Sequence, residues 1–183
     1  MLKPKPRFTR DDWIELGMAL LSKDGAEALT LERVTQAARK TRGSFYHHFV
    51  DYNAFLAAMG ERWLAQQTDA IIACADSALP DGLRREALAR LTADIDHALE
   101  RELRRLSTRE PAIAEAVAQA DERRIAYLAR LFRSELGLPP DEAIARARLQ
   151  HCYFVGAQSV FPHADSSFRL SLQKTLGQTL WRR

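Results

Sequence analysis

Cysteine is scarce in this chain of 183 residues, which contains only two. Cys74 and Cys152 fall in different predicted helices, and neither has partner residues at a spacing that suits a disulfide framework or a zinc site. We interpret both as buried thiols and expect no metal site.

Long apolar stretches are missing as well. No run reaches the roughly 18 apolar residues that a membrane span needs. The N-terminal segment Lys3-Pro4-Lys5-Pro6-Arg7 lacks the apolar core of a secretion signal. We therefore expect a cytoplasmic protein without a membrane partner.

The motifs of several enzyme classes do not occur. The sequence has no nucleophile elbow, no P-loop and no dinucleotide-binding glycine pattern. A di-iron carboxylate bundle needs two Glu-x-x-His pairs and two further glutamates, whereas this chain offers one Asp-x-x-His pair, Asp94 and His97. We predict no catalytic residues, no cofactor and no enzymatic activity.

Acidic residues are absent from residues 33–50, which carry four basic side chains. Residues 1–50 hold nine Lys and Arg against six Asp and Glu, whereas residues 51–183 hold 18 of each kind. The basic excess is thus confined to the first 50 residues, which favours a polyanionic partner at that end. A solvated charged surface has the same composition and stays an alternative.

Apolar residues repeat at helical spacing along the chain, and no convincing strand alternation occurs. We predict an all-α fold of about nine helices, with an N-terminal three-helix head and a C-terminal helical bundle. The helices are expected from Thr9 to Gly25, from Thr30 to about Lys40, over 41–49, from Asp51 towards Cys74, over 88–106 after a break at Pro80-Asp81-Gly82, over 112–118, over 121–136, from Pro139 to about Phe161, and from Ser166 to about Trp181.

The most informative segment is Thr41-Arg42-Gly43-Ser44-Phe45-Tyr46-His47-His48-Phe49. In a helix, Phe45 and Phe49 share one face and point into a core, whereas Arg42, Tyr46 and one histidine face outward. Guanidinium, phenol and imidazole groups bind phosphates and base edges, so the segment predicts a helix that enters the DNA major groove. A three-helix core element with incidental basic residues is the alternative.

The helix predicted from Thr30 ends a few residues before this segment, as in a helix-turn-helix. Together with Thr30-Leu31-Glu32-Arg33-Val34 and Phe55-Leu56, the segment resembles the tetracycline-repressor (TetR) family of bacterial transcriptional regulators. The resemblance is specific over residues 9–59. It implies a ligand-responsive repressor that binds a palindromic operator in double-stranded DNA as a homodimer.

Carried over residue by residue, the resemblance implies a set of DNA contacts. Thr41 would cap the recognition helix, Gly43 would admit close approach of the backbone, and Arg42 would read a guanine edge. The implied DNA-binding residues are Thr30, Arg33, Lys40, Thr41, Arg42, Gly43, Ser44, Tyr46, His47, His48 and Tyr52.

Three positions depart from the family pattern. Arg39 stands where the turn usually has glycine, and Lys40 stands where a small apolar residue is usual. The turn is therefore expected to differ in backbone shape and to gain phosphate contacts. Tyr52 stands where the family commonly has a phosphate-binding lysine, and its hydroxyl is expected to donate a hydrogen bond at lower electrostatic gain.

For the second half of the chain, the resemblance implies an effector pocket. The candidate contacts for a small-molecule effector are Trp63, Gln67 and His151, because a polar amide and an imidazole lie there among apolar neighbours. Internal hydrogen bonds would explain Gln67 and His151 equally well. Charged helical neighbours place His97 on a solvated face.

The resemblance also implies a dimer seam on the last two helices. Its candidate residues are Gly156, Phe168, Leu172 and Leu176, although such a stripe also fits an intrachain core. The chain is thus interpreted as a helix-turn-helix DNA-binding domain, residues 1–50, and an effector-binding and dimerisation domain, residues 51–183. The rival interpretations are a helical protein-interaction scaffold and a regulator without a small-molecule effector.

Overall fold

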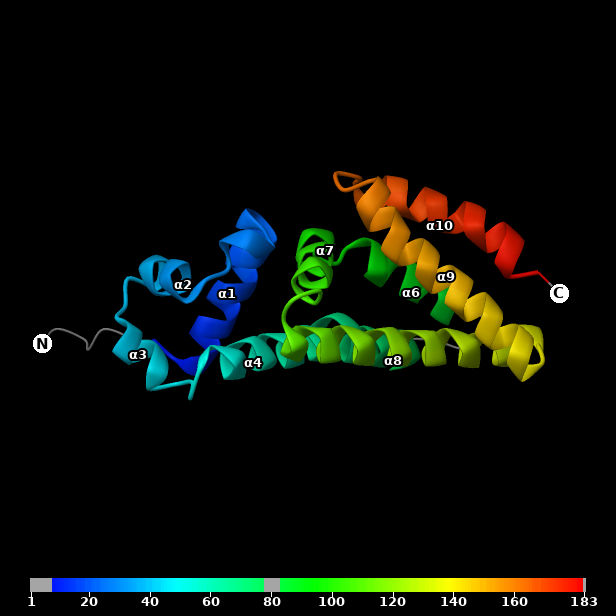
Figure 1. The fold of residues 1–183 in the computed structure, drawn as a ribbon. Helices are drawn as coiled ribbons and strands as arrows, with labels where there is room; N and C mark the ends of the chain where they lie inside the picture. The colour runs from blue at the N-terminus through cyan, green and yellow to red at the C-terminus, as the bar shows by residue number, and fades with distance from the viewer. Residues whose placement is uncertain (1–7, 78–82, 183) are drawn as a thin grey trace, which may run out of the picture.

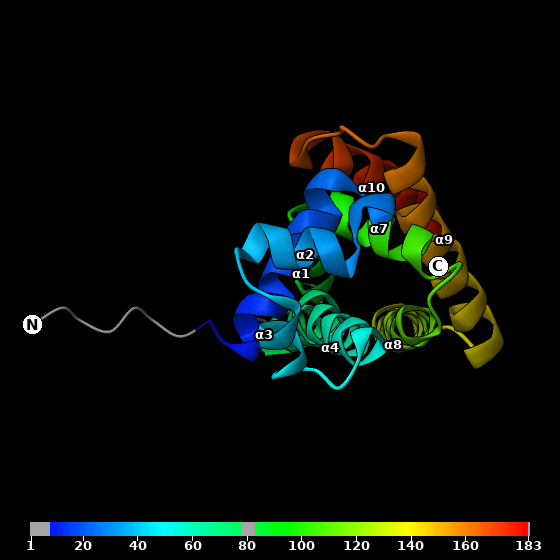
Figure 2. The same cartoon turned by 60° about the vertical axis from the view of Figure 1, so that its left-hand side comes forward.

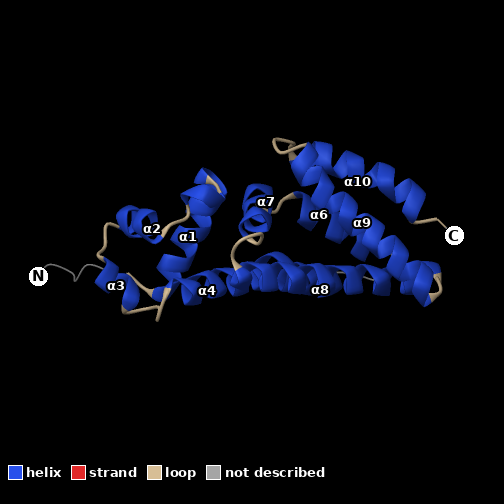
Figure 3. Ribbon diagram, in the orientation of Figure 1, coloured by secondary structure: helices blue, strands red, loops and turns tan. Residues whose placement is uncertain are grey.

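The structure, a computed structural model, describes residues 8–77 and 83–182. Helices and connecting loops make up this described part, which contains no strand (Figure 3). The predicted all-α fold is therefore confirmed, and the described residues form nine helices when α4, η2 and α5 are counted as one continuous helix. The basic N-terminal segment and the break predicted at Pro80-Asp81-Gly82 lie outside the described residues.

Two groups of helices follow each other along the chain. The head contains α1 (Arg10–Asp24), the short 3-10 helix η1 (Ala26–Ala28), α2 (Leu31–Ala38) and α3 (Arg42–Tyr46). A long helix follows, made of α4 (Tyr52–Leu64), the π-helical segment η2 (Ala65–Asp69) and α5 (Ala70–Ser77). The remaining helices are α6 (Arg84–Ala93), α7 (His97–Leu106), α8 (Pro111–Leu136), α9 (Pro140–Val160) and α10 (Ser166–Leu180). None of the described helices is both long and apolar enough to cross a bilayer.

The molecule is elongated, with the head at one end and α10 near the other (Figure 1). Helix α4 runs from the head alongside α8, and α7 lies between α1 and the C-terminal helices (Figure 1 and Figure 2). The head is therefore supported in two places. One is the continuous helix that begins with α4, and the other is the packed helix α7.

Short polar side chains begin the head helices where the sequence predicts them. Thr9 accepts a hydrogen bond from the Asp12 backbone N–H, and the Asp12 carboxylate accepts one from the Thr9 N–H, which closes a capping box. Thr30, Thr41 and Asp51 cap α2, α3 and α4 in the same way as Thr9 caps α1, each accepting from the N–H three residues later. These caps satisfy N–H groups that a helix leaves unpaired, so four predicted helix starts are confirmed.

Aromatic rings hold the head together. Phe45 of α3 is fully buried and meets Trp13 and Phe55 edge to face, with ring centroids 5.3 Å apart in both pairs. Phe49 packs beside Phe45 at 5.1 Å. The inward orientation predicted for both phenylalanines is confirmed. The same core continues into α7 and α8 through their buried aliphatic side chains, so the head rests on the C-terminal helices without a break.

Three predicted helix boundaries are wrong. The helix predicted over 41–49 is shorter, since α3 ends at Tyr46. The stretch 88–106 is divided into α6 and α7, because the Asp96 side chain caps α7 by accepting from the Leu99 N–H at 2.8 Å. The two helices predicted next form the single helix α8. Gln119 and Ala120, which separate the predicted halves, are good helix formers, so nothing local interrupts the helix there.

Both cysteines are exposed, which corrects their prediction as buried thiols. Each follows or precedes a buried position on its helix: Cys74 stands before Ala75, and Cys152 stands after His151. Consecutive residues of a helix point about 100° apart, so a buried neighbour turns a side chain away from the core.

Helices α4 and α8 approach each other closely at Gly60. A Cβ at this position would lie 2.8 Å from the Cβ of Ala116, closer than packed carbon atoms come. Because both residues are small, the two helices can run side by side. This packing brings η2 next to the middle of α8, where the buried polar residues described below are found.

Candidate functional site

The short helix α3 forms the outer end of the head (Figure 1). Thr41, Arg42 and Gly43 are exposed, and Tyr46 has half of its surface open. The buried Phe45 fixes the helix from below. The outer face therefore presents a guanidinium, hydroxyls and imidazoles without a carboxylate, which suits a partner that carries phosphates.

The other predicted contact residues lie around the same helix. Thr30 and Thr41 occupy the caps of α2 and α3, where helix dipoles favour an anion. The rings of His47 and His48 meet at 5.1 Å just after α3. The structure thus brings these residues together at one end of the molecule, and their contact with DNA stays a prediction.

Further cations stand beside α3. Lys40 and Arg10 each lie over a phenylalanine ring, at 5.8 and 5.2 Å from its centroid. Arg10 was not among the DNA-binding residues that the sequence predicted. Arg33 differs from these two, because its guanidinium lies 3.0 Å from the carboxylate of Asp24 and shares its charge with that residue.

The turn between α2 and α3 contains Arg39 in the left-handed conformation, with φ 51° and ψ 43°. Glycine adopts this conformation freely, whereas a residue with a Cβ is strained by about 1 kcal/mol. Arginine is therefore held in the conformation that glycine prefers, and a change in backbone shape relative to the family stays a prediction. The side chains of Arg39 and Lys40 are exposed.

Tyr52 has a role that the sequence did not indicate. Its hydroxyl donates a 2.8 Å hydrogen bond to the carbonyl of Leu29, in the loop before α2. Burial raises the pKa of this phenol to about 12. The donor expected for a DNA phosphate is thus used inside the head, which corrects the predicted role of the Tyr52 hydroxyl.

Helix α7 is joined to the head by polar contacts. The buried carboxylate of Glu102 accepts a hydrogen bond from the Ala26 N–H at 3.1 Å. Asp96, which caps α7, accepts one from the Ser22 hydroxyl at 2.8 Å. A displacement of α7 would therefore be passed directly to the end of α1 and to η1.

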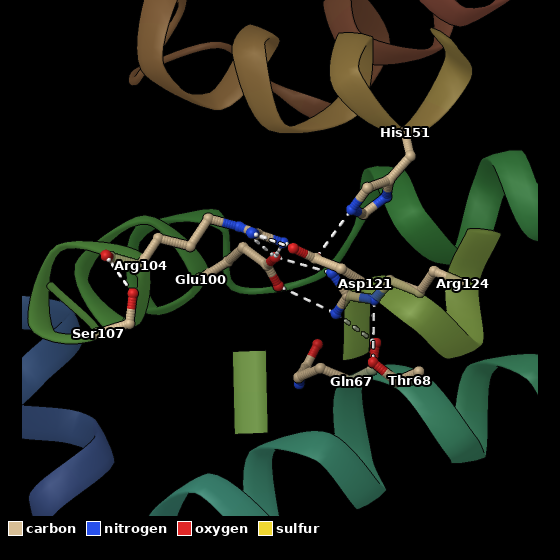
Figure 4. Close-up of polar contacts among 8 residues, drawn as sticks. All are labelled: Gln67, Thr68, Glu100, Arg104, Ser107, Asp121, Arg124 and His151. Carbon is tan, nitrogen blue, oxygen red and sulfur yellow. Dashed lines mark hydrogen bonds and ion pairs between the residues drawn. The ribbon is translucent and has the colours of Figure 1, made fainter. Parts of the chain in front are cut away.

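The opposite side of α7 faces a buried ion-pair network (Figure 4). Glu100 stands two residues before Glu102, so the two carboxylates point to opposite sides of the helix. Glu100 is fully buried and accepts both guanidinium ends of Arg124, at 2.7 and 3.1 Å. Arg104, one turn further along α7, donates to the same carboxylate at 2.9 and 3.1 Å. Two guanidinium groups on one carboxylate leave one positive charge over, which needs a further anion nearby.

Asp121 of α8 extends the network towards α9 (Figure 4). Its carboxylate accepts two hydrogen bonds from Arg104, at 2.6 and 3.0 Å, and lies 2.8 Å from Nε2 of His151. Burial raises the pKa of Asp121, but the contacts with His151 and Arg104 outweigh it and hold the pKa well below its usual range. The carboxylate is therefore ionised at neutral pH. We call Glu100, Arg104, Asp121, Arg124 and His151 the buried network.

The π-helical segment η2 closes this network from below. Arg124 donates to the Thr68 hydroxyl at 2.9 Å and to the Gln67 carbonyl at 3.1 Å. Its guanidinium also lies over the rings of Trp63 and Phe154, at 5.2 and 5.5 Å. A π-helical turn disturbs the regular backbone pairing, and such turns are frequent at functional sites. Arg124 thus ties the long helix to α7.

A cavity of about 700 Å³ lies beside the network, between α5, α6, α8, α9 and α10. Gln67 and His151 line it, as does Arg124. Trp63 does not, because it is fully buried within the core shared with the head, which corrects its proposed place in a pocket. The volume suits a small organic molecule, and effector contact by Gln67 and His151 stays a prediction.

The predicted dimer residues lie on different faces. Phe168 is exposed and packs edge to face against Phe161, with centroids 5.1 Å apart. Gly156 has open space where a Cβ would stand, and Leu172 is half-buried. Leu176 is half-buried and lines the cavity, and the place of all four residues in a dimer seam stays a prediction. The apolar stripe of α10 is therefore shared between the cavity and the surface.

The sequence pointed to one member of the buried network, His151, and its charge pattern predicted a solvated His97. His97 is half-buried, its Nε2 lies 3.2 Å from the Ala93 carbonyl, and burial lowers its pKa. One of the charged neighbours on which that prediction depended, Arg104, pairs inside the protein with Glu100 and Asp121. One signal was present: Glu100 and Arg104 have the i, i+4 spacing of an ion pair. Among the described residues, no three His, Cys, Asp or Glu side chains are grouped to hold a metal ion.

The head of the chain matches a known protein family. Residues 14–59 match the family model of bacterial regulatory proteins, tetR family. This range contains α2, α3 and the turn between them, so the match covers the candidate recognition surface. No curated protein sequence matches the chain significantly.

Solved structures share the fold of the whole chain. The reduced form of NemR from E. coli is 20% identical, with a TM-score of 0.73, over 91% of this chain and 96% of that one. Regulatory protein TetR from Rhodobacter sphaeroides is also 20% identical, with a TM-score of 0.73, over 94% and 98% of the two chains. The fatty acid degradation regulator FadR from Bacillus halodurans is 15% identical, with a TM-score of 0.68, over 96% of each chain. The head, residues 14–59, therefore belongs to the TetR family of bacterial regulatory proteins, and the chain as a whole shares the fold of these solved structures.

Proposed function

We propose that this protein is a ligand-responsive repressor that binds a palindromic operator in double-stranded DNA as a homodimer. The observation that carries the proposal is the acid-free, exposed face of α3 at the outer end of the head, anchored by the buried Phe45. Residues 1–50 act as the DNA-binding domain, and residues 51–183 bind the effector and the second subunit. A helical interaction scaffold would leave this face unexplained.

In the proposed complex, α3 enters the major groove. Arg42 projects from its first turn and forks onto the O6 and N7 atoms of a guanine. Lys40, Tyr46 and the two histidines contact phosphates on either side and position the helix without reading sequence. Arg10, which lies over the Phe49 ring, adds one more cation to this phosphate-binding border.

The proposed dimer forms through the outer face of α9 and α10. Leu149 and Val160 are 59% and 68% exposed, and the spacing of 11 residues puts them on one face of α9. Gly156 lies between them on that face, with open space above it. Phe161 and Phe168 extend the apolar surface onto α10. A two-fold contact of this surface with itself would bury all four large apolar side chains.

The proposed response to an effector runs through α7. A molecule in the cavity meets Arg124 and His151, which belong to the buried network. Through Glu100 and Arg104 the network holds one side of α7, and the other side of α7 holds the head through Glu102. An effector that binds better to one position of α7 would therefore change the separation of the two heads and shift the operator affinity.

Selection of duplexes from a random pool by the purified protein tests the proposal. We expect a two-fold symmetric consensus whose half-sites lie about one helical turn, roughly 34–36 Å, apart. Binding to the selected site should weaken steeply with salt, with a log–log slope of about −0.9 for each phosphate that is neutralised. Enrichment of no sequence, or a complex insensitive to salt, would refute the proposal.

A further inference from the structure

The cavity is charge-balanced at its buried end. Arg124 is the cation that reaches this end, and it uses four N–H donors on Glu100, Thr68 and Gln67. His151 is likewise engaged, because its Nε2 lies 2.8 Å from the carboxylate of Asp121. A ligand charge placed here would find its countercharge already engaged, so the buried end favours an uncharged part of a ligand.

The exposed end of the cavity is cationic. Of the cations in the lining, Lys174 and Arg182 are exposed and Arg85 is partly buried, so we take these three to mark its solvent side; within the described residues no ion pair joins any of them to a carboxylate. Glu86 is the one acidic residue of the lining, and it lies 3.7 Å from Arg90. Three positive charges are therefore left without an acidic partner at one end of a cavity whose other end is neutral.

Arg85 is held ready to bind a planar anion. Its guanidinium lies over the Trp181 ring, with 5.0 Å from Cζ to the centroid. Trp181 is fixed in turn, because it stacks on Phe132 at 4.0 Å and donates a hydrogen bond from Nε1 to Gln150 at 3.0 Å. A stacked guanidinium keeps its N–H edge free and in one plane, which matches the two oxygens of a carboxylate.

Between these two ends the walls are apolar. They include Ile71, Leu88, Leu128, Phe154, Leu170 and Leu176, contributed by five different helices. Such walls bury a hydrophobic body from several sides, which supplies most of the binding free energy of a small ligand.

We propose that the cavity binds an amphipathic organic anion, namely an aromatic or branched apolar body that carries one carboxylate. The carboxylate pairs with Arg85 and Lys174 at the exposed end, and the body lies along the apolar walls towards Gln67 and His151. This assignment of ligand class deepens the proposed function and rests on it. A cationic ligand would be repelled by these three cations, which have no carboxylate partner among the described residues, and a neutral ligand would leave them unused.

Three pyrene derivatives of equal body provide the test: 1-pyrenebutanoate, its neutral amide and 1-pyrenebutylammonium. Binding is followed by energy transfer from tryptophan to pyrene, with the full-length protein. We expect the carboxylate to bind at least about tenfold more tightly than the amide, which is the value of one charged hydrogen-bond pair, and the ammonium to bind most weakly. Equal affinity for carboxylate and amide, preference for the ammonium, or binding of none of the three would overturn the assignment.

Variants locate the anion. Arg85→Gln and Lys174→Gln should each weaken the binding of the carboxylate about tenfold and change the affinity for the amide less than about twofold. Arg133→Gln removes the same charge from the exposed side of α8, outside the cavity, and should change neither. If Arg85→Gln does not fold, Lys174→Gln still decides the question. An equal loss of carboxylate and amide in both variants would show that the cations do not hold the anion.

A further experiment tests the proposed ligand response separately from the proposed ligand class. The carboxylate is added to the complex of the protein with its selected operator, and the operator affinity is measured. Selective binding of the carboxylate without a change in operator affinity would refute the proposed ligand response and leave the ligand class standing. Equal binding of carboxylate and amide together with intact operator binding would refute the ligand class and leave the proposed DNA binding standing.

Discussion

The hydroxyl of Tyr52 donates a 2.8 Å hydrogen bond to the carbonyl of Leu29, which precedes it by 23 residues. This bond joins the first turn of α4 to the loop that leads into α2. The helix that carries the head into the rest of the molecule is thereby fixed to the helix that positions α3. The side chain that replaces a common lysine of the family is therefore part of the head's internal framework.

Replacement of Tyr52 by Phe should lower the free energy of unfolding by about 1 kcal/mol, because the Leu29 carbonyl loses its partner. Above pH 10 the difference in free energy of unfolding between the variant and the parent protein should narrow. The pKa of Tyr52 is raised from 10.0 to about 12, so between these values the unfolded chain releases a proton that the folded chain keeps. The free energy of unfolding of the parent protein therefore falls as the pH rises through this window. For Tyr52→Phe it should fall less steeply, by up to the contribution of about one bound proton.

Urea titrations at pH 8 and from pH 10 to 12 measure both effects. Tyr46→Phe is the matched control, since Tyr46 is half exposed and should change stability little. Parallel pH curves for Tyr52→Phe and the parent protein would contradict the role given to the phenol.

Replacement of Arg39 by Gly should raise the stability of the protein and lower its affinity for DNA. Glycine relieves the left-handed strain at φ 51°, and after the entropy cost of glycine in the unfolded chain we expect a gain of about 0.5 kcal/mol. Loss of the cation should weaken binding to all duplexes alike and reduce the salt slope by up to about one unit. Lys40→Gly is the control, because Lys40 has no positive φ and should lose both stability and affinity. A destabilised Arg39→Gly variant would show that the arginine makes a contact worth more than the strain.

Replacement of Arg42 by Ala should weaken the selected operator by about 1–3 kcal/mol and blur the preference at one base pair in each half-site. The physical reason is the loss of a bidentate contact to one base. Fluorescence anisotropy with the selected and a scrambled duplex measures it, and Lys40→Ala serves as a comparison that should weaken both duplexes equally. An equal loss on both duplexes for Arg42→Ala would make this residue a phosphate contact.

Replacement of Glu100 by Gln should destabilise the protein by about 3 kcal/mol, because Arg104 and Arg124 would remain buried without their shared carboxylate. Thermal unfolding of this variant and of Glu115→Gln makes the comparison. Glu115 is an exposed glutamate of α8, and its replacement should change stability by less than about 0.5 kcal/mol. A Glu100→Gln variant as stable as the Glu115→Gln variant would show that the buried network contributes nothing to folding.

Replacement of Leu149 or Phe168 by Glu should convert the dimer to a monomer with a folded head, because a carboxylate in the proposed seam would lose its hydration without gaining a partner. Sedimentation equilibrium measures the mass. Val50→Glu is the control, since Val50 is 85% exposed but lies in the head, far along the chain from α9 and α10. Intact dimers of both seam variants would move the interface to another surface.

The sequence by itself determined the head. Its helix starts depend on caps between residues three apart, Thr9, Thr30, Thr41 and Asp51, and its core depends on aromatic residues at helical spacing. Such short-range relationships can be read directly from the order of residues, because helix geometry fixes which neighbours meet.

Only the tertiary structure decided the second half. Glu100 and Arg124 read as two surface charges in the sequence, and they become a buried pair because α7 packs on α8, beside which α4 runs closely at Gly60. Leu176 is turned to a cavity for the same reason, as five helices must come together before that cavity exists. Contacts between residues 20 or more apart depend on how helices cross, and a hydrophobic period does not encode that crossing.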